Sequence, residues 1–269
     1  MRGSGMHVDV SGCGAALVML HGWGMHGGVW GDVVARLSQD FEVHNVDLPG
    51  HGFSVGRASA RLMQDVGLKP DSQLGCMVDA LSDRFPEPVS VLGWSLGGLI
   101  AQRWAAREPH KIERLILVAS TPCFTAREDW LCGMPAATLQ QFAAELENNH
   151  AATLRRFLAL QLRGSENERE LLSQLREKLF RRGEPELDAL RAGLDILREV
   201  DLRGELAQIS SPTLVVAGER DKLTPPQASR YLAENIPTAR RVEIRDAAHL
   251  PFLSHAEKFI GPVAQFLRE

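Results

Sequence analysis

The stretch Val89-Ser-Val-Leu-Gly-Trp-Ser-Leu-Gly-Gly-Leu-Ile100 decides the fold of this chain. It begins as a run of β-branched and apolar residues, typical of a buried strand, and continues as a helical pattern from Leu99 to Ala106. Between the two lies Gly93-Trp-Ser-Leu-Gly97, a G-x-S-x-G sequence in the strand-turn-helix setting that this motif requires. The turn would lift the Ser95 hydroxyl clear of the sheet, near the positive end of a helix. The context favours a nucleophilic serine, although the pentapeptide alone can be only a Gly-Ser turn.

The composition is that of a globular protein with a large core: 269 residues, 44% hydrophobic, 24% charged, with a net charge of -4. General nucleic-acid binding has no electrostatic support, because no broad basic surface is expected. No apolar run is long enough to span a bilayer, and Met1–Val8 lacks the apolar segment of a secretory signal. The four scattered cysteines have no metal-ligand spacing, so we expect free thiols in a reducing cytoplasm and no metal. No dinucleotide fingerprint or phosphate-binding loop indicates a cofactor.

Strand and helix patterns alternate in the first part of the chain and again near its end. Strands are expected over 6–10, 15–20, 41–46, from 89, and over 112–119, 213–217 and 239–244, and helices over 30–37, 73–85, 99–106 and 254–268. The continuous apolar runs are typical of strands buried on both faces. The pattern therefore predicts an α/β fold with a mostly parallel central sheet flanked by helices.

The pattern changes between about residues 124 and 203, where no strand is expected. Helices are expected over 136–148, 150–162, 166–181 and 186–199. Such a long helical connection is not an ordinary crossover. We therefore predict a helical cap, residues 122–203, inserted in a core formed by residues 1–121 and 204–269, over the sheet edge where open α/β folds place their sites. The polar, irregular segment 55–70 is expected to be an exposed excursion of unknown function.

Three side chains follow predicted strands in the order Ser95, Asp221, His249. Because the carboxyl ends of parallel strands meet at one edge of a sheet, these side chains can converge there. Neutral His249 would take the Ser95 proton and later return it to the leaving group. Asp221 would hold the imidazole in the required tautomer and stabilise its charged form. The three residues are therefore the candidate catalytic triad.

A glycine-rich turn, His21-Gly-Trp-Gly24, follows another buried strand. The backbone N–H groups of Trp23 and Leu96 would bind the developing oxyanion, although a plain strand-to-helix loop is the alternative for the first of them. Other candidates compete with the triad. His51 stands in a Gly-Pro turn and is expected to be structural, and Asp246 is expected to shape a turn. Cys123 has no activating neighbour in the sequence and is interpreted as a small apolar residue.

Five segments together resemble the α/β-hydrolase superfamily over essentially the whole chain. They are His21-Gly-Trp-Gly24, Asp47-Leu-Pro-Gly-His-Gly-Phe-Ser54, Gly93-Trp-Ser-Leu-Gly-Gly98, Gly218-Glu-Arg-Asp221 and Ala248-His249. The order of the triad residues is also the order in that superfamily.

Within the superfamily, the chain resembles the biotin-pathway carboxylesterases that hydrolyse pimeloyl-[acyl-carrier protein] methyl ester. The resemblance is carried by the G-x-S-x-G segment and by Ala119-Ser-Thr-Pro-Cys-Phe-Thr-Ala-Arg-Glu-Asp-Trp130, Arg156-Phe-Leu-Ala-Leu-Gln161 and Leu194-Asp-Ile-Leu-Arg-Glu-Val-Asp-Leu-Arg203. The cap matches matter most, because activity varies on a shared fold. The resemblance implies a cytoplasmic serine esterase that works through an acyl-enzyme and releases methanol.

The resemblance also implies the substrate contacts. Trp23 would lie at the ester, and the acyl chain would run in a tunnel below the cap. The implied substrate-binding residues are Trp23, Ser95, Leu96, Phe157, Leu158, Ala159, Leu160, Gln161 and His249. For Phe157 and Leu158, simple helix core is an equal alternative. The acidic carrier protein would dock on Arg156 and Arg169, although neighbouring glutamates interleave with these arginines.

Two other functions remain open on the sequence alone. A general short-chain carboxylesterase, or a hydrolase of C–C bonds, would use the same three residues, so only the cap could distinguish them. A non-catalytic ligand receptor on this fold is disfavoured by the intact Ser95, Asp221 and His249. A monomer without a nucleic-acid or membrane partner is expected.

Overall fold

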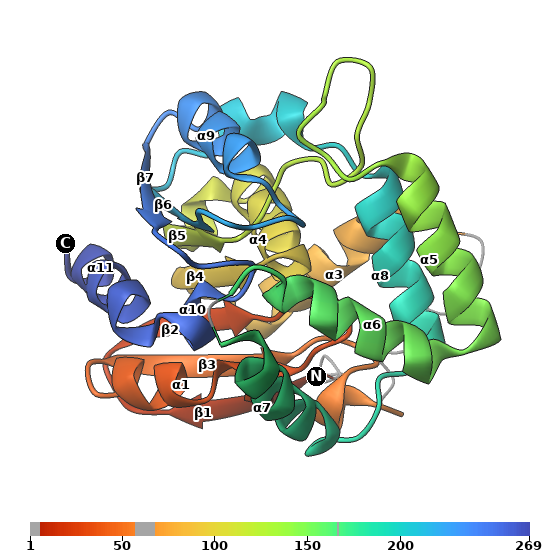
Figure 1. Ribbon diagram of the computed structural model, residues 1–269. Coiled ribbons are helices and arrows are strands. Elements are labelled where there is room, and N and C mark those ends of the chain that lie inside the picture. Colours follow the sequence, from red (N-terminus) through yellow and green to blue (C-terminus); the bar gives the residue numbers. More distant parts are fainter. Residues whose placement is uncertain (1–5, 57–67, 166) are drawn as a thin grey trace.

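A computed structural model describes residues 6–56, 68–165 and 167–269 (Figure 1). Its centre is a seven-stranded sheet in the order β1-β3-β2-β4-β5-β6-β7. The strands are β1 (His7–Ser11), β2 (Ala15–Leu20), β3 (Phe41–Asp47), β4 (Val89–Trp94), β5 (Ile112–Val118), β6 (Thr213–Gly218) and β7 (Ala239–Ile244). Only the pair β1–β3 is antiparallel among these strands, so the predicted mostly parallel sheet is confirmed.

Neighbouring strands end at nearly the same level. Leu20 at the end of β2 pairs with Gly93, and Trp94 at the end of β4 pairs with Val118. The central strands are apolar and buried along nearly their whole length, because helices cover both faces of the sheet (Figure 1). The loops after β2, β4 and β6 consequently leave the sheet along one edge.

Four of the core helices correspond to predicted helices but begin at different residues. The core helices are α1 (Asp32–Leu37), α3 (Pro70–Arg84), α4 (Leu96–Arg107), α9 (Pro226–Asn235), α10 (Pro251–Ser254) and α11 (Ala256–Arg268), with 3₁₀ turns η1 (Gly27–Trp30), η2 (Gly52–Ser54), η3 (Pro109–Lys111) and η4 (Arg203–Gln208). Helix α3 begins three residues before the prediction because Pro70 is suited to a first helical turn. The helix predicted over 254–268 is α11, which begins at Ala256; α9 and the short helix α10 were not predicted.

Four helices lie between β5 and β6 in the chain. They are α5 (Ala136–Asn148), α6 (His150–Leu162), α7 (Glu168–Phe180) and α8 (Leu187–Glu199). Helix α5 packs on α6 and α8, α6 packs on α7, and α8 reaches the core helix α3. In Figure 1 these four helices stand together beside the sheet. The predicted 166–181 helix starts at residue 168, and residue 166 lies outside the described residues, as do residues 57–67 of the predicted excursion.

Candidate active site

Ser95 occupies a tight turn between β4 and α4. Its φ of 55° is a left-handed value that a residue with a side chain rarely adopts. The turn is possible because the neighbouring glycines leave no space for a side chain: a Cβ at Gly93 would lie 2.4 Å from the Gly97 carbonyl oxygen, and one at Gly97 would lie 2.3 Å from that of Leu20. The Ser95 N–H donates to the Val118 carbonyl at 3.0 Å, which fixes the turn to the next strand. The strained conformation is therefore held by close packing on both sides.

Asp221 follows β6 and is held by hydrogen bonds to both carboxylate oxygens. Its Oδ1 accepts from the N–H of Leu223 at 2.8 Å and of Thr224 at 3.0 Å. Its Oδ2 accepts from the Thr224 hydroxyl at 2.7 Å and lies 2.8 Å from His249 Nδ1. Because an ionised carboxylate only accepts, this geometry assigns the imidazole proton to Nδ1. Thr224 was not among the predicted site residues, and its hydroxyl three residues after a strand-end aspartate is the signal that could have pointed to it.

His249 is buried beside the strand that carries the serine. Its carbonyl accepts from Trp94 Nε1 at 3.0 Å, and the two rings are 5.6 Å apart. Its Nε2 is buried and has no hydrogen-bond partner among the described residues. A buried imidazole oriented at Nδ1 and open at Nε2 is the arrangement that a general base needs. The structure thus brings His249 onto Asp221 and against Trp94, the residue before Ser95.

The loop after β2 lies directly on the serine turn. A Cβ at Gly22 would come within 3.2 Å of the Ser95 Cβ. His21 anchors the loop: its Nε2 accepts from the Leu48 N–H at 2.9 Å, and its Nδ1 donates to the Gly22 carbonyl at 2.9 Å. Burial lowers the pKa of His21 well below its usual value, so the ring is neutral and structural.

The two candidate oxyanion donors belong to these two neighbouring segments. Leu96 is the first residue of α4, where a backbone N–H has no carbonyl one helical turn earlier to bond. Trp23 lies in the loop after β2, and its indole Nε1 donates to the Leu190 carbonyl of α8 at 2.8 Å. A backbone donor after β2 and another at the start of α4 is the arrangement expected of an oxyanion site.

Five of the predicted substrate-binding residues lie on α6, and two of them contact residues of this site. Phe157 meets the Trp23 ring edge-on at a centroid distance of 4.7 Å. The Gln161 carbonyl accepts from the His249 N–H at 3.3 Å, and both polar atoms of its buried side-chain amide lack a hydrogen-bond partner among the described residues. Leu158 is fully buried in the core, whereas Ala159 and Leu160 are half-buried.

The two predicted docking arginines lie on the exposed surfaces of α6 and α7. Arg156 contacts both carboxylate oxygens of Glu145, at 2.7 and 2.6 Å, and its guanidinium lies over the Phe142 ring at 5.2 Å. Arg169 is exposed near the start of α7.

The competing residues are used elsewhere. His51 Nδ1 bonds the Pro49 carbonyl at 2.9 Å, and burial lowers the pKa of His51 to about 4. Asp246 is paired with Arg220 and has a φ of 65° in the turn before His249. Burial raises the pKa of the Cys123 thiol, so the thiolate is disfavoured. The structure places Asp221, not Asp246, on the His249 ring.

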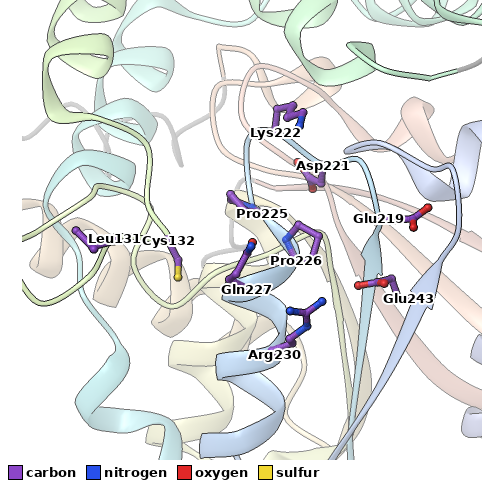
Figure 2. Close-up of a pocket in the computed structure, with 10 residues that line it drawn as sticks. All are labelled: Leu131, Cys132, Glu219, Asp221, Lys222, Pro225, Pro226, Gln227, Arg230 and Glu243. Carbon is purple, nitrogen blue, oxygen red and sulfur yellow. The ribbon is translucent and has the colours of Figure 1, made fainter.

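A hollow of about 720 Å³ lies on the outer side of the loop that carries Asp221 (Figure 2). Figure 2 shows its wall, which combines an apolar part at Leu131 and Pro225 with charges of both signs at Lys222 and Glu243. The Asp221 side chain is 0% exposed, so the hollow meets the back of the loop and not the imidazole. Within the described ranges, no group of three or more His, Cys, Asp or Glu side chains could hold a metal ion, and no helix is long and apolar enough to cross a membrane.

Comparisons with known proteins agree with this architecture. Residues 15–256 match the family described as alpha/beta hydrolase fold. The chain is 44% identical over 256 residues, 95% of its length and 97% of the relative's, to the protein of Nitrosomonas europaea named Pimeloyl-[acyl-carrier protein] methyl ester esterase. It is 42% identical to the protein of the same name from Chromobacterium violaceum, with 97% of this chain and 98% of that one covered.

Solved structures show the same fold. An esterase from Exiguobacterium antarcticum superposes with a TM-score of 0.84 at 21% identity, covering 98% of this chain and 96% of that one. An enol-lactonase from Burkholderia xenovorans gives a TM-score of 0.77 at 25% identity, covering 98% and 96%. The family match spans the serine turn, the aspartate loop and the histidine loop, and the chain therefore belongs to the α/β-hydrolase family.

Proposed function

We propose that the chain is a serine carboxylesterase that hydrolyses pimeloyl-[acyl-carrier protein] methyl ester to pimeloyl-[acyl-carrier protein] and methanol, in biotin biosynthesis. The observation that carries the proposal is the similarity to esterases of that name, 44% identical over 95% of this chain. This similarity extends over the helices between β5 and β6, a part of the chain in which proteins that share a fold differ in activity. The oriented imidazole on Asp221 supports the chemistry.

In the proposed mechanism, Ser95 Oγ attacks the ester carbonyl carbon as His249 Nε2 takes the hydroxyl proton. The N–H groups of Trp23 and Leu96 would stabilise the oxyanion, and each such donor is typically worth about 3 kcal/mol. The C–O bond to the methoxy group then breaks, and His249 returns the proton so that methanol leaves. Water, activated by the same imidazole, would hydrolyse the acyl-enzyme and release the free carboxylate. Asp221 keeps the ring oriented throughout.

We further propose that residues 122–203 form a cap domain on a core of residues 1–121 and 204–269. The division is supported by helices α5–α8, which follow one another between β5 and β6 and pack on one another. Hydrogen bonds from Trp23 to Leu190 and from His249 to Gln161 join these helices to the core. The acyl chain would lie under the cap along residues 157–161. The unpartnered amide of Gln161 supports a polar contact with substrate, since buried amides normally find a partner.

The carrier protein would dock on the cap surface, with Arg156 and Arg169 meeting acidic residues or the phosphate of its prosthetic arm. Arg156 would exchange Glu145 for a carboxylate of the carrier. Both arginines are exposed, so they are accessible to a partner. The proposed substrate also implies a cytoplasmic location, and we propose that the enzyme acts as a monomer.

The deciding experiment compares methanol release from pimeloyl-[acyl-carrier protein] methyl ester with hydrolysis of a short p-nitrophenyl ester. We expect a strong kcat/KM preference for the carrier-bound ester, and loss of both activities in Ser95→Ala with the fold retained. Efficient hydrolysis of the small ester with none of the carrier-bound ester would overturn the biotin role but leave a serine esterase. Full activity of Ser95→Ala would overturn the mechanism.

A further inference from the structure

Gly193 lies in the middle of α8, buried, at the point where this helix meets the loop after β2. A Cβ built at Gly193 would lie 2.8 Å from Cδ1 and 3.3 Å from Nε1 of the Trp23 indole, and 3.3 Å from Cδ2 of Leu96. The first distance is shorter than real Cβ contacts, and the other two are tight. The space that a side chain would fill at this helical position is therefore occupied by the indole of Trp23.

The indole has little freedom to move away. Its Nε1 donates to the Leu190 carbonyl, three residues before Gly193 in α8, and Phe157 of α6 packs against its ring. Trp23 itself is 2% exposed. Any shift that relieved a new contact at Gly193 would have to break the hydrogen bond or displace the ring on Phe157.

A second glycine, in the loop after β2, makes a similar close contact with helix α6. Gly24 follows Trp23 in the loop, with a φ of 70°, and a Cβ there would lie 2.6 Å from Cδ1 of Leu154 in α6. At Gly24 the loop has no side chain, and Leu154 of α6 fills that space. At Gly193 helix α8 has no side chain, and Trp23 of the loop fills that space. The loop and the two helices fit together at these two glycines.

We infer that Gly193 is a positioning residue for the reaction at Ser95: by leaving room for the Trp23 indole, it lets α8 fix the loop whose backbone N–H faces the oxyanion. The inference rests on the proposed function of Trp23 and Leu96 as oxyanion donors. A side chain at residue 193 would push on the Trp23 indole and so move the Trp23 N–H, which must converge with that of Leu96 on one oxygen. The 3.3 Å approach to the end of the Leu96 side chain needs only a small shift. Such donors act only when positioned within a fraction of an ångström.

The test is Gly193→Ala, measured with a small p-nitrophenyl ester so that it does not depend on the identity of the carrier substrate. We expect kcat to fall by about 100-fold, the scale of a 1 Å misplacement and the lower end of the loss of one oxyanion donor, with KM changed much less. A purely structural defect would instead reduce the amount of active enzyme, which titration of Ser95 with a fluorophosphonate would reveal.

The matched control is Gly75→Ala. Gly75 also lies inside an α-helix, α3, but a Cβ there would meet only the flexible end of Arg107 among the described residues, at 3.3 Å. Alanine is the better helix former, so the control should be at least as stable as the parent and fully active. Normal turnover by Gly193→Ala would overturn the inference and leave the proposed esterase function intact.

A double-mutant cycle shows whether the effect passes through Trp23. In a Trp23→Ala background, the new methyl group at residue 193 meets no indole, so Gly193→Ala should cost less than about twofold in kcat. Equal costs in both backgrounds would contradict the inference. If Gly193→Ala fails to fold, the variant that combines Gly193→Ala with Trp23→Ala provides the test. It should fold and hydrolyse the ester at the rate of Trp23→Ala. A double variant that is also unfolded would contradict the inferred contact.

Discussion

The edge of the sheet and the surface of the proposed cap, residues 122–203, hold their polar side chains in different ways. At the sheet edge, Asp221 and His249 are almost completely buried, and each oxygen of the carboxylate accepts two hydrogen bonds. On the cap surface, Arg156 has about half of its side chain exposed and shares one carboxylate, while Arg169 is open to solvent. We therefore expect substitutions at the sheet edge to disturb the geometry of the reacting groups, and substitutions of Arg156 or Arg169 to leave it unchanged.

Besides the hydrogen bonds of Trp23 and His249, an apolar contact and an ionic contact join the two regions. Near the serine turn the contact is apolar, through Trp23 and Phe157. Farther away it is ionic: Arg182, between α7 and α8, reaches Asp47 at the end of β3 at 3.0 and 3.1 Å and Asp9 of β1 at 2.5 Å. The apolar contact depends on the fit of two rings and the ionic contact on opposite charges. Substitutions at each should therefore have different effects on activity and stability.

The largest effect is expected where the sheet edge determines the chemistry. Asp221→Asn can no longer hold the imidazole in the required tautomer, and we expect kcat to fall by about 10⁴-fold. The matched control is Asp246→Asn, which alters the other acid near His249, one paired with Arg220. The control should retain activity within a few-fold in the same esterase assay. Similar losses of kcat in the two variants would show that Asp221, which bonds the imidazole, is no more important than Asp246.

A smaller effect is expected at the ionic contact between the two regions. Arg182→Met would leave the fully buried Asp47 without its counter-charge, and we expect unfolding free energy to fall by about 3 kcal/mol. Two backbone N–H groups, from Gly27 and Phe53, still bond that carboxylate. Urea denaturation is the measurement. In Arg181→Met, which removes an exposed pair with Glu177, the change should stay below about 1 kcal/mol.

The smallest effect depends on pH and concerns the buried core. Because the pKa of His51 is lowered to about 4 in the folded protein, only the unfolded chain binds its proton between about pH 6.5 and 4. Stability must therefore fall as the pH decreases through this window, by about 2 kcal/mol at pH 5 for this group alone. His21 and His26, whose pKa values burial also lowers, act in the same direction.

Replacing His51 by Gln should reduce the stability difference between about pH 7.5 and pH 5, measured by urea midpoints. The exposed His110 provides the comparison, since His110→Gln should leave that difference unchanged. An identical pH dependence in His51→Gln and the parent would show that other groups govern the acid response.

Much of the fold was predictable because its elements are local in sequence. A continuous apolar run such as residues 15–20 can be buried on both faces only as a central strand, and β2 occupies those residues. The helix over 187–199 was predictable from leucines at helical spacing. The position of Asp221 after a strand, compared with Asp246 in a turn, also selected the carboxylate that contacts His249.

The remaining contacts could not be predicted, because they join residues far apart in the chain. Arg182 is 135 residues from Asp47, and nothing in the local pattern of either residue indicates the other. The Trp23 hydrogen bond to Leu190 spans 167 residues and uses a backbone carbonyl, which has no sequence signature at all. The contact of Gly193 with Trp23 also joins distant residues, so the sequence around Gly193 indicates only a glycine that lowers the stability of a helix.

The hydrogen bond between His249 and Gln161 fastens the candidate base to helix α6. The His249 N–H donates to the Gln161 carbonyl at the last turn of α6, so the backbone of the candidate base is tied to a helix that overlies the site. A displacement of α6 wide enough to admit a long acyl chain would release this tie. Admission and turnover would then belong to different positions of α6, and the base would be held in place only when the helix has returned.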